Sequence, residues 1–260
     1  MQRKPLHTLM SFILVLMVVS LACSTTQATP VPTNTAAPTA TATVSPTPTQ
    51  TPRPSPTPRP TKTPNLAATE QADKLNAELQ DYFDKGYLST TEGRFRELDD
   101  FSYEWAQLHY YKPFLIQDGV SDFYMGAHFK WDSAFKNSDV SGCGFIFNVQ
   151  QNGDHYAVFL DRQKVVFLIT DSRLGFSKKV SPTRGTGTVK FDYPAEADFT
   201  LIVKDAYAYV LVNGEVSAEY TLAQSRSSKG ALGMTVLSGT NKDYGTRCEM
   251  TNLHLWLPTK

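Results

Sequence analysis

The 260-residue sequence lacks a hydrophobic run long enough to cross a membrane as a helix. Its longest apolar stretch, residues 9–19, is about half of the roughly 20 residues that a bilayer-spanning helix needs. Arg3 and Lys4 come just before that stretch. A positively charged start followed by a short apolar segment is typical of a secretory signal peptide. We therefore expect residues 1–22 to be a signal peptide and the chain after them to be exported.

Cysteine is scarce, with three in the whole chain. The first, Cys23, follows Ser20-Leu21-Ala22, and this run resembles the lipobox of bacterial lipoprotein precursors. The match departs at Ser20, where the commonest lipobox has Leu. The resemblance implies a diacylglyceryl group on Cys23 that holds the protein in membrane lipid, because stable anchoring takes more than one acyl chain. The alternative is an ordinary secretory signal cleaved near Ala22, with Cys23 unmodified.

Acidic and aromatic residues are absent from residues 24–65, a segment with 11 Pro and 14 Thr among its 42 residues. Such a segment cannot bury enough apolar surface to fold. Its proline content favours extended polyproline II, with a reach of roughly 130 Å. We expect residues 23–65 to be a disordered stalk that carries a domain away from the membrane. Ser24 is not the Asp that often retains lipoproteins at an inner membrane, so the resemblance implies a lipid-anchored, extracytoplasmic location in the cell envelope, at an outer face or outer membrane.

An excess of positive charge is also missing from the rest of the chain. Five of the 25 cationic residues precede residue 66 and all 25 acidic residues follow it, so the remainder carries 20 positive and 25 negative residues, a net of −5. Nucleic-acid binding needs a basic footprint for the phosphate backbone. We therefore expect no nucleic-acid partner.

Motifs for metal and nucleophile chemistry are absent too. The sequence has no Cys-x-x-Cys, His-x-His or His-x₃-His spacing among its exported residues, and no Gly-x-Ser-x-Gly. We expect no metal and no cofactor. A calcium site at Asp154, Asp161 or Asp171 is the alternative to their more ordinary role as turn residues.

Apolar residues at steps of three and four predict a helix over residues 66–85, with Gly86 as its C-cap. Leu79, Tyr82 and Phe83 form a stripe that would dock this helix on a neighbouring domain. The alternative is a helix that only ends the stalk. The helix and its connecting loop are expected to occupy residues 66–97.

From residue 98 onward the pattern is that of strands. Residues 123–131 alternate between apolar and polar positions, and further strands are expected over residues 144–149, 156–160, 165–169, 199–203, 207–212, 215–220, 232–237 and 248–257. Asn213-Gly214 predicts a tight hairpin turn. Many short strands separated by turn signals predict a mainly β, antiparallel sandwich or barrel.

Three groups of residues resemble concanavalin-A-like jelly rolls. They are Leu98-Asp99-Asp100-Phe101-Ser102, then residues 142–147 (Gly-Cys-Gly-Phe-Ile-Phe) with the strand beyond, and last residues 209–215, 230–233 and 251–256. The resemblance covers residues 98–257 and implies a jelly-roll domain over residues 98–260. The superfamily includes laminin-G-like and pentraxin-like binding modules, family-16-type glucanases and the domain described as a 3-keto-disaccharide hydrolase.

The glucanases of that fold carry paired carboxylates in a Glu-x-Asp-x-x-Glu arrangement, and this chain has none on an expected strand. Glu215 and Glu219 are spaced by four but are expected to be solvated. The leading hypothesis is therefore a non-catalytic binding module for a glycan or envelope polymer. The alternatives are a 3-keto-disaccharide hydrolase-type enzyme, for which no catalytic residue can be named, and a structural module for protein adhesion.

Strand phase suggests a ligand face. Tyr124, His128 and Asn148, with Trp256, are expected to share a solvent-facing concave side, where aromatic rings stack on sugars and polar groups take their hydroxyls. The alternative is that these are ordinary surface residues of a sheet.

The two remaining cysteines, Cys143 and Cys248, are expected to form a disulfide. An exported chain meets an environment in which such bonds persist, and a lipidated Cys23 leaves an even pair of thiols. The glycines flanking Cys143 would let a neighbouring strand approach closely, and the resembling fold returns its closing strand beside early ones. The alternative is two buried free cysteines that act as small apolar residues.

Overall fold

The structure is a computed structural model that describes residues 66–138, 140–223 and 229–259. The expected signal peptide (1–22), the lipidated Cys23 and the stalk (23–65) lie outside these residues and stay predictions. The described residues all belong to one compact unit. Within the described part of the chain, no helix is both long and apolar enough to span a bilayer.

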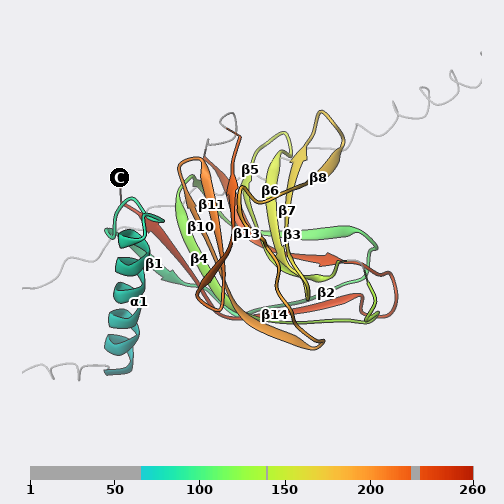
Figure 1. The fold of residues 1–260 in the computed structure, drawn as a ribbon, viewed down its shortest axis with the longest axis horizontal. Coiled ribbons are helices and arrows are strands. Elements are labelled where there is room, and N and C mark those ends of the chain that lie inside the picture. Colours follow the sequence, from blue (N-terminus) through green and yellow to red (C-terminus); the bar gives the residue numbers. More distant parts are fainter. Residues whose placement is uncertain (1–65, 139, 224–228, 260) are drawn as a thin grey trace, which may run out of the picture. The chain divides into compact units, whose positions relative to one another are not determined.

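The described residues form one helix and two antiparallel sheets that pack face to face as a sandwich (Figure 1). The helix is α1 (Leu66–Asp84). The first strands are β1 (Gly93–Glu97), β2 (Phe101–Trp105), β3 (Tyr110–Val120), β4 (Phe123–Ser133), β5 (Gly142–Val149), β6 (His155–Leu160) and β7 (Val165–Asp171). The remaining strands are β8 (Phe176–Val180), β9 (Arg184–Gly185), β10 (Ala195–Lys204), β11 (Tyr207–Val212), β12 (Glu215–Thr221), β13 (Gly230–Ser238) and β14 (Thr246–Pro258).

The order of strands in each sheet is not the order along the chain. Sheet A has the order β1-β14-β4-β10-β11-β12-β9, with β2 paired to β14, and sheet B has the order β3-β13-β5-β6-β7-β8. The last strand, β14, thus inserts beside the early strand β4, and β13 inserts between β3 and β5. The antiparallel jelly-roll sandwich expected from the sequence is confirmed.

The sheet begins earlier than the sequence indicated. β1 pairs with β14 from Gly93↔Pro258 to Glu97↔His254, so residues 93–97 belong to the sandwich and not to a connecting loop that ends at residue 97. All five residues of β1 are exposed. A strand with no buried side has no apolar alternation, and the expected boundary at residue 98 was therefore wrong.

Aromatic rings from both sheets fill the space between the layers. Phe129 of β4 lies 5.2 Å from Phe145 of β5 and 4.8 Å from Phe199 of β10, measured between ring centroids. Trp131 is 1% exposed and Phe123 2%. The alternation expected along β4 is thus confirmed on its inward side, because every second residue from Phe123 to Trp131 is buried in this core.

Cys143 and Cys248 form the expected disulfide, with their Cα atoms 5.5 Å apart. The bond joins β5 of sheet B to β14 of sheet A, so it crosses the core instead of linking neighbouring strands. The glycines beside Cys143 serve a different contact from the one expected. A Cβ on Gly142 would lie 2.0 Å from the Leu160 carbonyl oxygen, and one on Gly144 would lie 2.1 Å from that of Val158, so both glycines admit β6.

Helix α1 packs on the outer face of sheet A. Leu79 and Tyr82, both 3% exposed, join a second apolar cluster with residues of β4, β10, β11 and β14. Gly86, with φ of +78°, ends the helix, and its amide donates to the Phe83 carbonyl. The docking helix expected from the sequence is therefore present, although Phe83 is 42% exposed and does not belong to the docked stripe.

Candidate functional site

Two of the four expected ligand residues are buried. Tyr124 is 1% exposed and Trp256 is 2% exposed, and both lie beneath α1 in the second apolar cluster. The Tyr124 hydroxyl is hydrogen-bonded to Nε2 of His254 at 2.8 Å. The strand phase placed them correctly on the outer face of sheet A, but the expectation of a solvent-facing groove there was wrong because the helix covers that face.

The other two expected residues lie on different sheets. His128 is on β4 of sheet A, and its Nδ1 is 2.9 Å from Oδ1 of Asp198. Asn148 is on β5 of sheet B and is 8% exposed, with a φ of +53°. Gln150 donates from Nε2 to Oδ1 of Asn148 at 3.1 Å. The structure therefore does not gather Tyr124, His128, Asn148 and Trp256 into one face.

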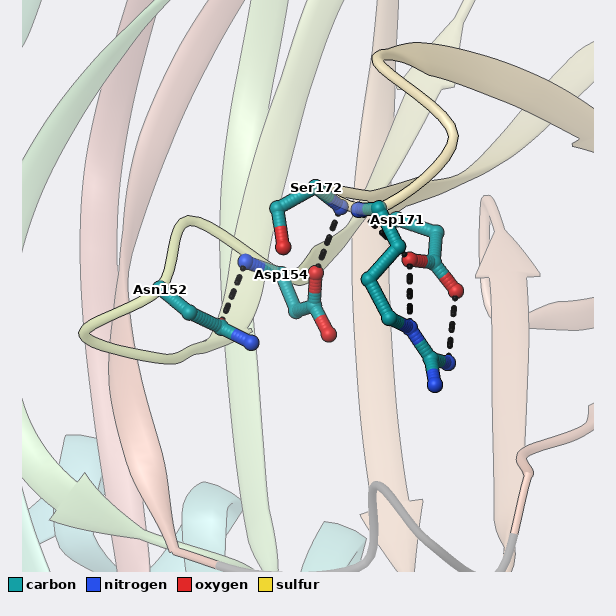
Figure 2. Close-up of polar contacts among 5 residues, drawn as sticks. Asn152, Asp154, Asp171 and Ser172 are labelled. Atoms are coloured by element: carbon teal, nitrogen blue, oxygen red, sulfur yellow. Dashed lines mark hydrogen bonds and ion pairs between the residues drawn. The ribbon is translucent and has the colours of Figure 1, made fainter.

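Two of the three aspartates considered as calcium ligands, Asp154 and Asp171, act as turn residues (Figure 2). Asp154 accepts the backbone N–H of Ser172 at 2.7 Å, and its own N–H donates to Oδ1 of Asn152 at 3.1 Å. Asp171 accepts the backbone N–H and the guanidinium of Arg173, at 3.0 to 3.2 Å. Across the described ranges, no group of three or more His, Cys, Asp or Glu side chains is arranged to hold a metal ion.

Asp161 lies apart from the other two, in the interior. It is 2% exposed and accepts the Tyr193 hydroxyl at 3.2 Å and the Ser141 backbone N–H at 3.4 Å. Burial raises the pKa of this carboxyl. A raised pKa suits a general acid, but Asp161 takes part in a buried network that also contains the hydroxyls of Ser138 and Ser141. Its geometry is that of a structural group.

Glu219 is also not the solvated carboxylate that the sequence suggested. It is 9% exposed, on β12, and accepts the guanidinium of Arg184 on β9, with Nε 2.7 Å from Oε2. Glu215, four residues earlier, is exposed. Because Glu219 is neutralised by Arg184, the two glutamates do not form a pair of equivalent catalytic carboxylates.

The structure offers a different polar site, on the face of sheet B that is turned away from sheet A. Tyr111 at the start of β3 extends over this face, and its hydroxyl lies 2.5 Å from Nε2 of His155, 2.8 Å from Oγ1 of Thr170 and 3.2 Å from Oγ of Ser177. These partners come from β6, β7 and β8. Four strands thus contribute to one half-buried polar cluster, which we name the Tyr111 cluster.

To reach these partners, Tyr111 lies across β13 and β5, the strands between β3 and β6, and small residues on β13 and β5 leave room for it. Phe159 lies 5.4 Å from Tyr111 between ring centroids, and a Cβ on Gly144 would lie 2.6 Å from the Phe159 ring. The ring of Phe159 therefore lies over the glycine, and Tyr111 packs on that ring. Thr235, which pairs with Gly144, is fully buried, and its hydroxyl has no hydrogen-bond partner within the described residues. Tyr111 also packs against the apolar cluster of this face, which contains Phe159 and Leu168, so the Tyr111 cluster lies on an apolar floor.

A cleft of about 700 Å³ adjoins the β5–β6 turn, between that turn and the ends of β3 and β13. Its lining is mostly polar: Asp118, Gly119, Val149, Gln150, Gln151, Asn152, Asp154, Lys229, Gly230 and Ala231. The turn connects the cleft to the Tyr111 cluster, because Nδ1 of His155 is 2.7 Å from the Gly153 carbonyl oxygen. Side-chain amides, carboxylates and an ammonium group line the cleft, so it can both donate hydrogen bonds and accept them.

Sequence reasoning did not find these residues. Tyr111 lies on a strand that was not predicted, and residues 150–154 were left as the connection between two strands. The run Gln150-Gln151-Asn152 carries three side-chain amides in a turn, and this was the one available signal, since binding residues are often placed on loops held by a rigid scaffold.

Comparisons with known proteins give neither a matching family model nor a matching curated protein. Among solved structures, a carbohydrate-binding module CBM66 from Bacillus subtilis is 10% identical with a TM-score of 0.43, covering 61% of this chain and 92% of that one. A Bacillus licheniformis β-glucanase is 13% identical with a TM-score of 0.40, covering 56% and 69%.

A fructosyltransferase from A. japonicus is 15% identical with a TM-score of 0.42 and covers 65% of this chain, which corresponds to 27% of the fructosyltransferase. Likenesses of this size do not assign a function. Fold and site together define the class of the protein, a jelly-roll β-sandwich with an open polar cleft at one end of its smaller sheet, and its function has to be argued from that site.

Proposed function

We propose that the domain binds a polysaccharide without cleaving it, through the polar cleft beside the β5–β6 turn. The observation that carries this proposal is the lining of the cleft, where Asp118, Gln151, Asn152 and Lys229 present amide, carboxylate and ammonium groups around one open space. Sugar hydroxyls both donate and accept, so they are matched by a mixture of such groups. The cleft is open, and a chain of sugar units can therefore pass through it.

Binding without cleavage is supported by the placement of the acidic residues. Hydrolysis of a glycosidic bond takes a carboxylic acid with a raised pKa facing a second carboxylate across the substrate. Asp161 has a raised pKa, but it is buried under Tyr193. Asp154, on the cleft wall, is held by the Ser172 amide as part of the turn.

We also propose that the domain is displayed at the outside of the cell envelope by a lipid on Cys23 and the stalk of residues 23–65. The Ser20-Leu21-Ala22-Cys23 run and the Pro/Thr-rich composition support this part of the proposal. A tethered module of this kind holds a glycan close to the cell surface.

The test is a glycan-array screen of the detergent-solubilised full-length protein, followed by titration of the best glycan. Gln151 is exposed and Asp118 lines the cleft, so Gln151→Ala combined with Asp118→Ala should weaken binding by about tenfold or more, as loss of polar anchors commonly does. The matched control is Gln107→Ala, which removes an exposed amide from the β2–β3 loop. Equal affinity in the cleft variant, or release of reducing ends from the bound glycan, would overturn the proposal.

A further inference from the structure

The charge of the domain is unevenly distributed along the chain. Residues 162–190 contain seven cationic residues and one acidic residue, Asp171. Residues 66–260 carry 20 positive and 25 negative residues, so those outside this segment carry 13 positive and 24 negative. A net charge of +6 is therefore concentrated in a short segment, whereas the rest of the domain has a net charge of −11.

The fold places this segment along one lateral edge of the sandwich. β8 is the last strand in the order of sheet B, and β9 is the last in that of sheet A. Only residues 181–183 separate the two strands, so the chain crosses between the sheets here. The chain beyond β9 then returns beside the β6–β7 turn, where the Val189 amide donates to the Gln163 carbonyl at 3.1 Å and the Phe191 amide to that of Arg162 at 2.8 Å.

We name the seven cations of this segment the basic edge: Arg162, Lys164, Arg173, Lys178, Lys179, Arg184 and Lys190. All except the half-buried Arg162 are exposed. Arg173 and Arg184 have carboxylate partners in Asp171 and Glu219, yet their side chains are 83% and 70% exposed. The four lysines form no ion pair with any described residue of the chain.

The geometry of β8 suits a chain-like ligand. Among the described residues the strand pairs on one side only, with β7, so its other side is a free edge of the sheet. Lys178 and Lys179 are successive residues of β8, and their side chains project from opposite faces of the sheet. They therefore flank whatever lies along the free edge. Phe176, two residues earlier, is 58% exposed and offers an aromatic ring on the same strand.

We propose that the basic edge binds an anionic polysaccharide, a linear chain of sugars that carry carboxylate groups. The cations run along the edge from the β6–β7 turn through β8 to the β7–β8 turn, and repeated negative charges on a linear chain would match them. A sugar ring can stack on Phe176. This proposal concerns a second surface, because the cleft is lined by other residues. Either proposal can therefore be contradicted without the other.

A flat anionic membrane fits the arrangement less well. A bilayer contacts cations that lie in one plane, whereas Lys178 and Lys179 lie on opposite sides of a strand. A second explanation for the lysines is that they protect an exposed edge from pairing with another chain, as charged residues on edge strands often do. The experiment must distinguish polysaccharide binding from membrane binding and from protection of the edge.

The test measures binding of the detergent-solubilised full-length protein to immobilised polygalacturonate, with neutral dextran as the comparison polymer. Lys178→Glu combined with Lys179→Glu should weaken polygalacturonate binding by about tenfold or more, because two attractions become repulsions. Raising the salt from about 20 mM to about 200 mM should weaken binding by the parent protein as screening increases. The matched control is Lys74→Glu with Lys136→Glu, the same charge change at exposed sites on α1 and the β4–β5 loop.

Four outcomes would overturn the proposal: no polygalacturonate binding by the parent, equal loss in the control pair, undiminished binding by the β8 variant, or binding to phosphatidylglycerol vesicles in place of the polymer. If Lys178 and Lys179 only prevent strand pairing, the β8 variant should bind the polymer as the parent does, because its glutamates keep the edge charged. The cleft variant Gln151→Ala with Asp118→Ala should bind polygalacturonate as the parent does, which separates this inference from the proposed function.

Discussion

At the scale of single residues, Asp161 shows how a buried carboxyl depends on neutral partners. It receives hydrogen bonds from the Tyr193 hydroxyl and the Ser141 amide, and burial is the first cause of its raised pKa. Burial disfavours the charged form, and hydrogen bonds to the carboxylate offset only part of that cost. The folded protein therefore holds a proton on Asp161 more tightly than the unfolded chain does.

This predicts a dependence of stability on pH. The carboxyl of an unfolded chain titrates near pH 3.9. Because the folded-state pKa lies above that value, the folded state binds more protons between the two values, and stability falls as pH rises from about 4 to the folded-state pKa. Asp161→Asn keeps an acceptor for Tyr193 and should remove that fall, as measured by urea unfolding at a series of pH values. Asp99→Asn, at an exposed carboxyl, should leave the fall in stability with pH unchanged. If stability falls with pH in Asp161→Asn as it does in the parent, Asp161 is not the group responsible.

Tyr124 and Trp256 mark the limit of sequence reasoning at this scale. Which face of a strand a residue occupies follows from local alternation, and the phase was right for both. Whether that face meets water depends on what packs over it, and here both residues are covered by α1, which ends 40 residues before Tyr124. The disulfide was predictable because it follows from the number of available thiols. The Tyr111 cluster was not, because its partners are as many as 66 residues apart and have no common motif.

At the scale of elements, α1 is attached to sheet A by few large side chains. Leu79→Ala should lower the free energy of unfolding by about 2–4 kcal/mol, since it removes a buried leucine from a packed cluster. Phe83→Ala is the matched control on the same helix and should cost under about 1 kcal/mol, because Phe83 is largely exposed. Chemical unfolding followed by tryptophan fluorescence measures both, and equal effects would mean that α1 does not dock through Leu79.

The elements that could be predicted are those whose signals are local. Asn213 and Gly214 both have positive φ, +53° and +80°, and form the tight turn between β11 and β12 that their chemistry indicates. β3 was missed, since exposed and half-buried residues follow no clear alternation along it and Pro113 interrupts the pattern. β9 has two residues and carries no pattern at all.

At the scale of the whole molecule, the proposed lipid anchor makes a testable claim about where the protein is found. Cys23→Ser should release the protein from cells into the medium or periplasm and abolish its labelling by a fatty-acid probe, because acyl chains on that sulfur supply the membrane affinity. Ser24→Ala, one residue further on, is the control and should stay cell-bound. A Cys23→Ser protein that still partitions into detergent like its parent would contradict the anchor.

The disulfide between Cys143 and Cys248 would have a mechanical consequence under the proposed anchor, which holds the domain by its N-terminal side. Tension from a surface-bound ligand would enter through α1 and then β1, whose pairing with β14 can open one residue after another. Chain pulled out from that end reaches Cys143, where the bond to Cys248 divides the tension, because it closes a loop over the following 105 positions of the chain. The cleft wall at residues 149–154 and the basic edge at residues 162–190 both lie inside that loop. A pull strong enough to strip the first strands would therefore lengthen the tether and remove Asp118 from the cleft, while the basic edge and the 149–154 wall of the cleft stayed within the covalently closed part of the chain.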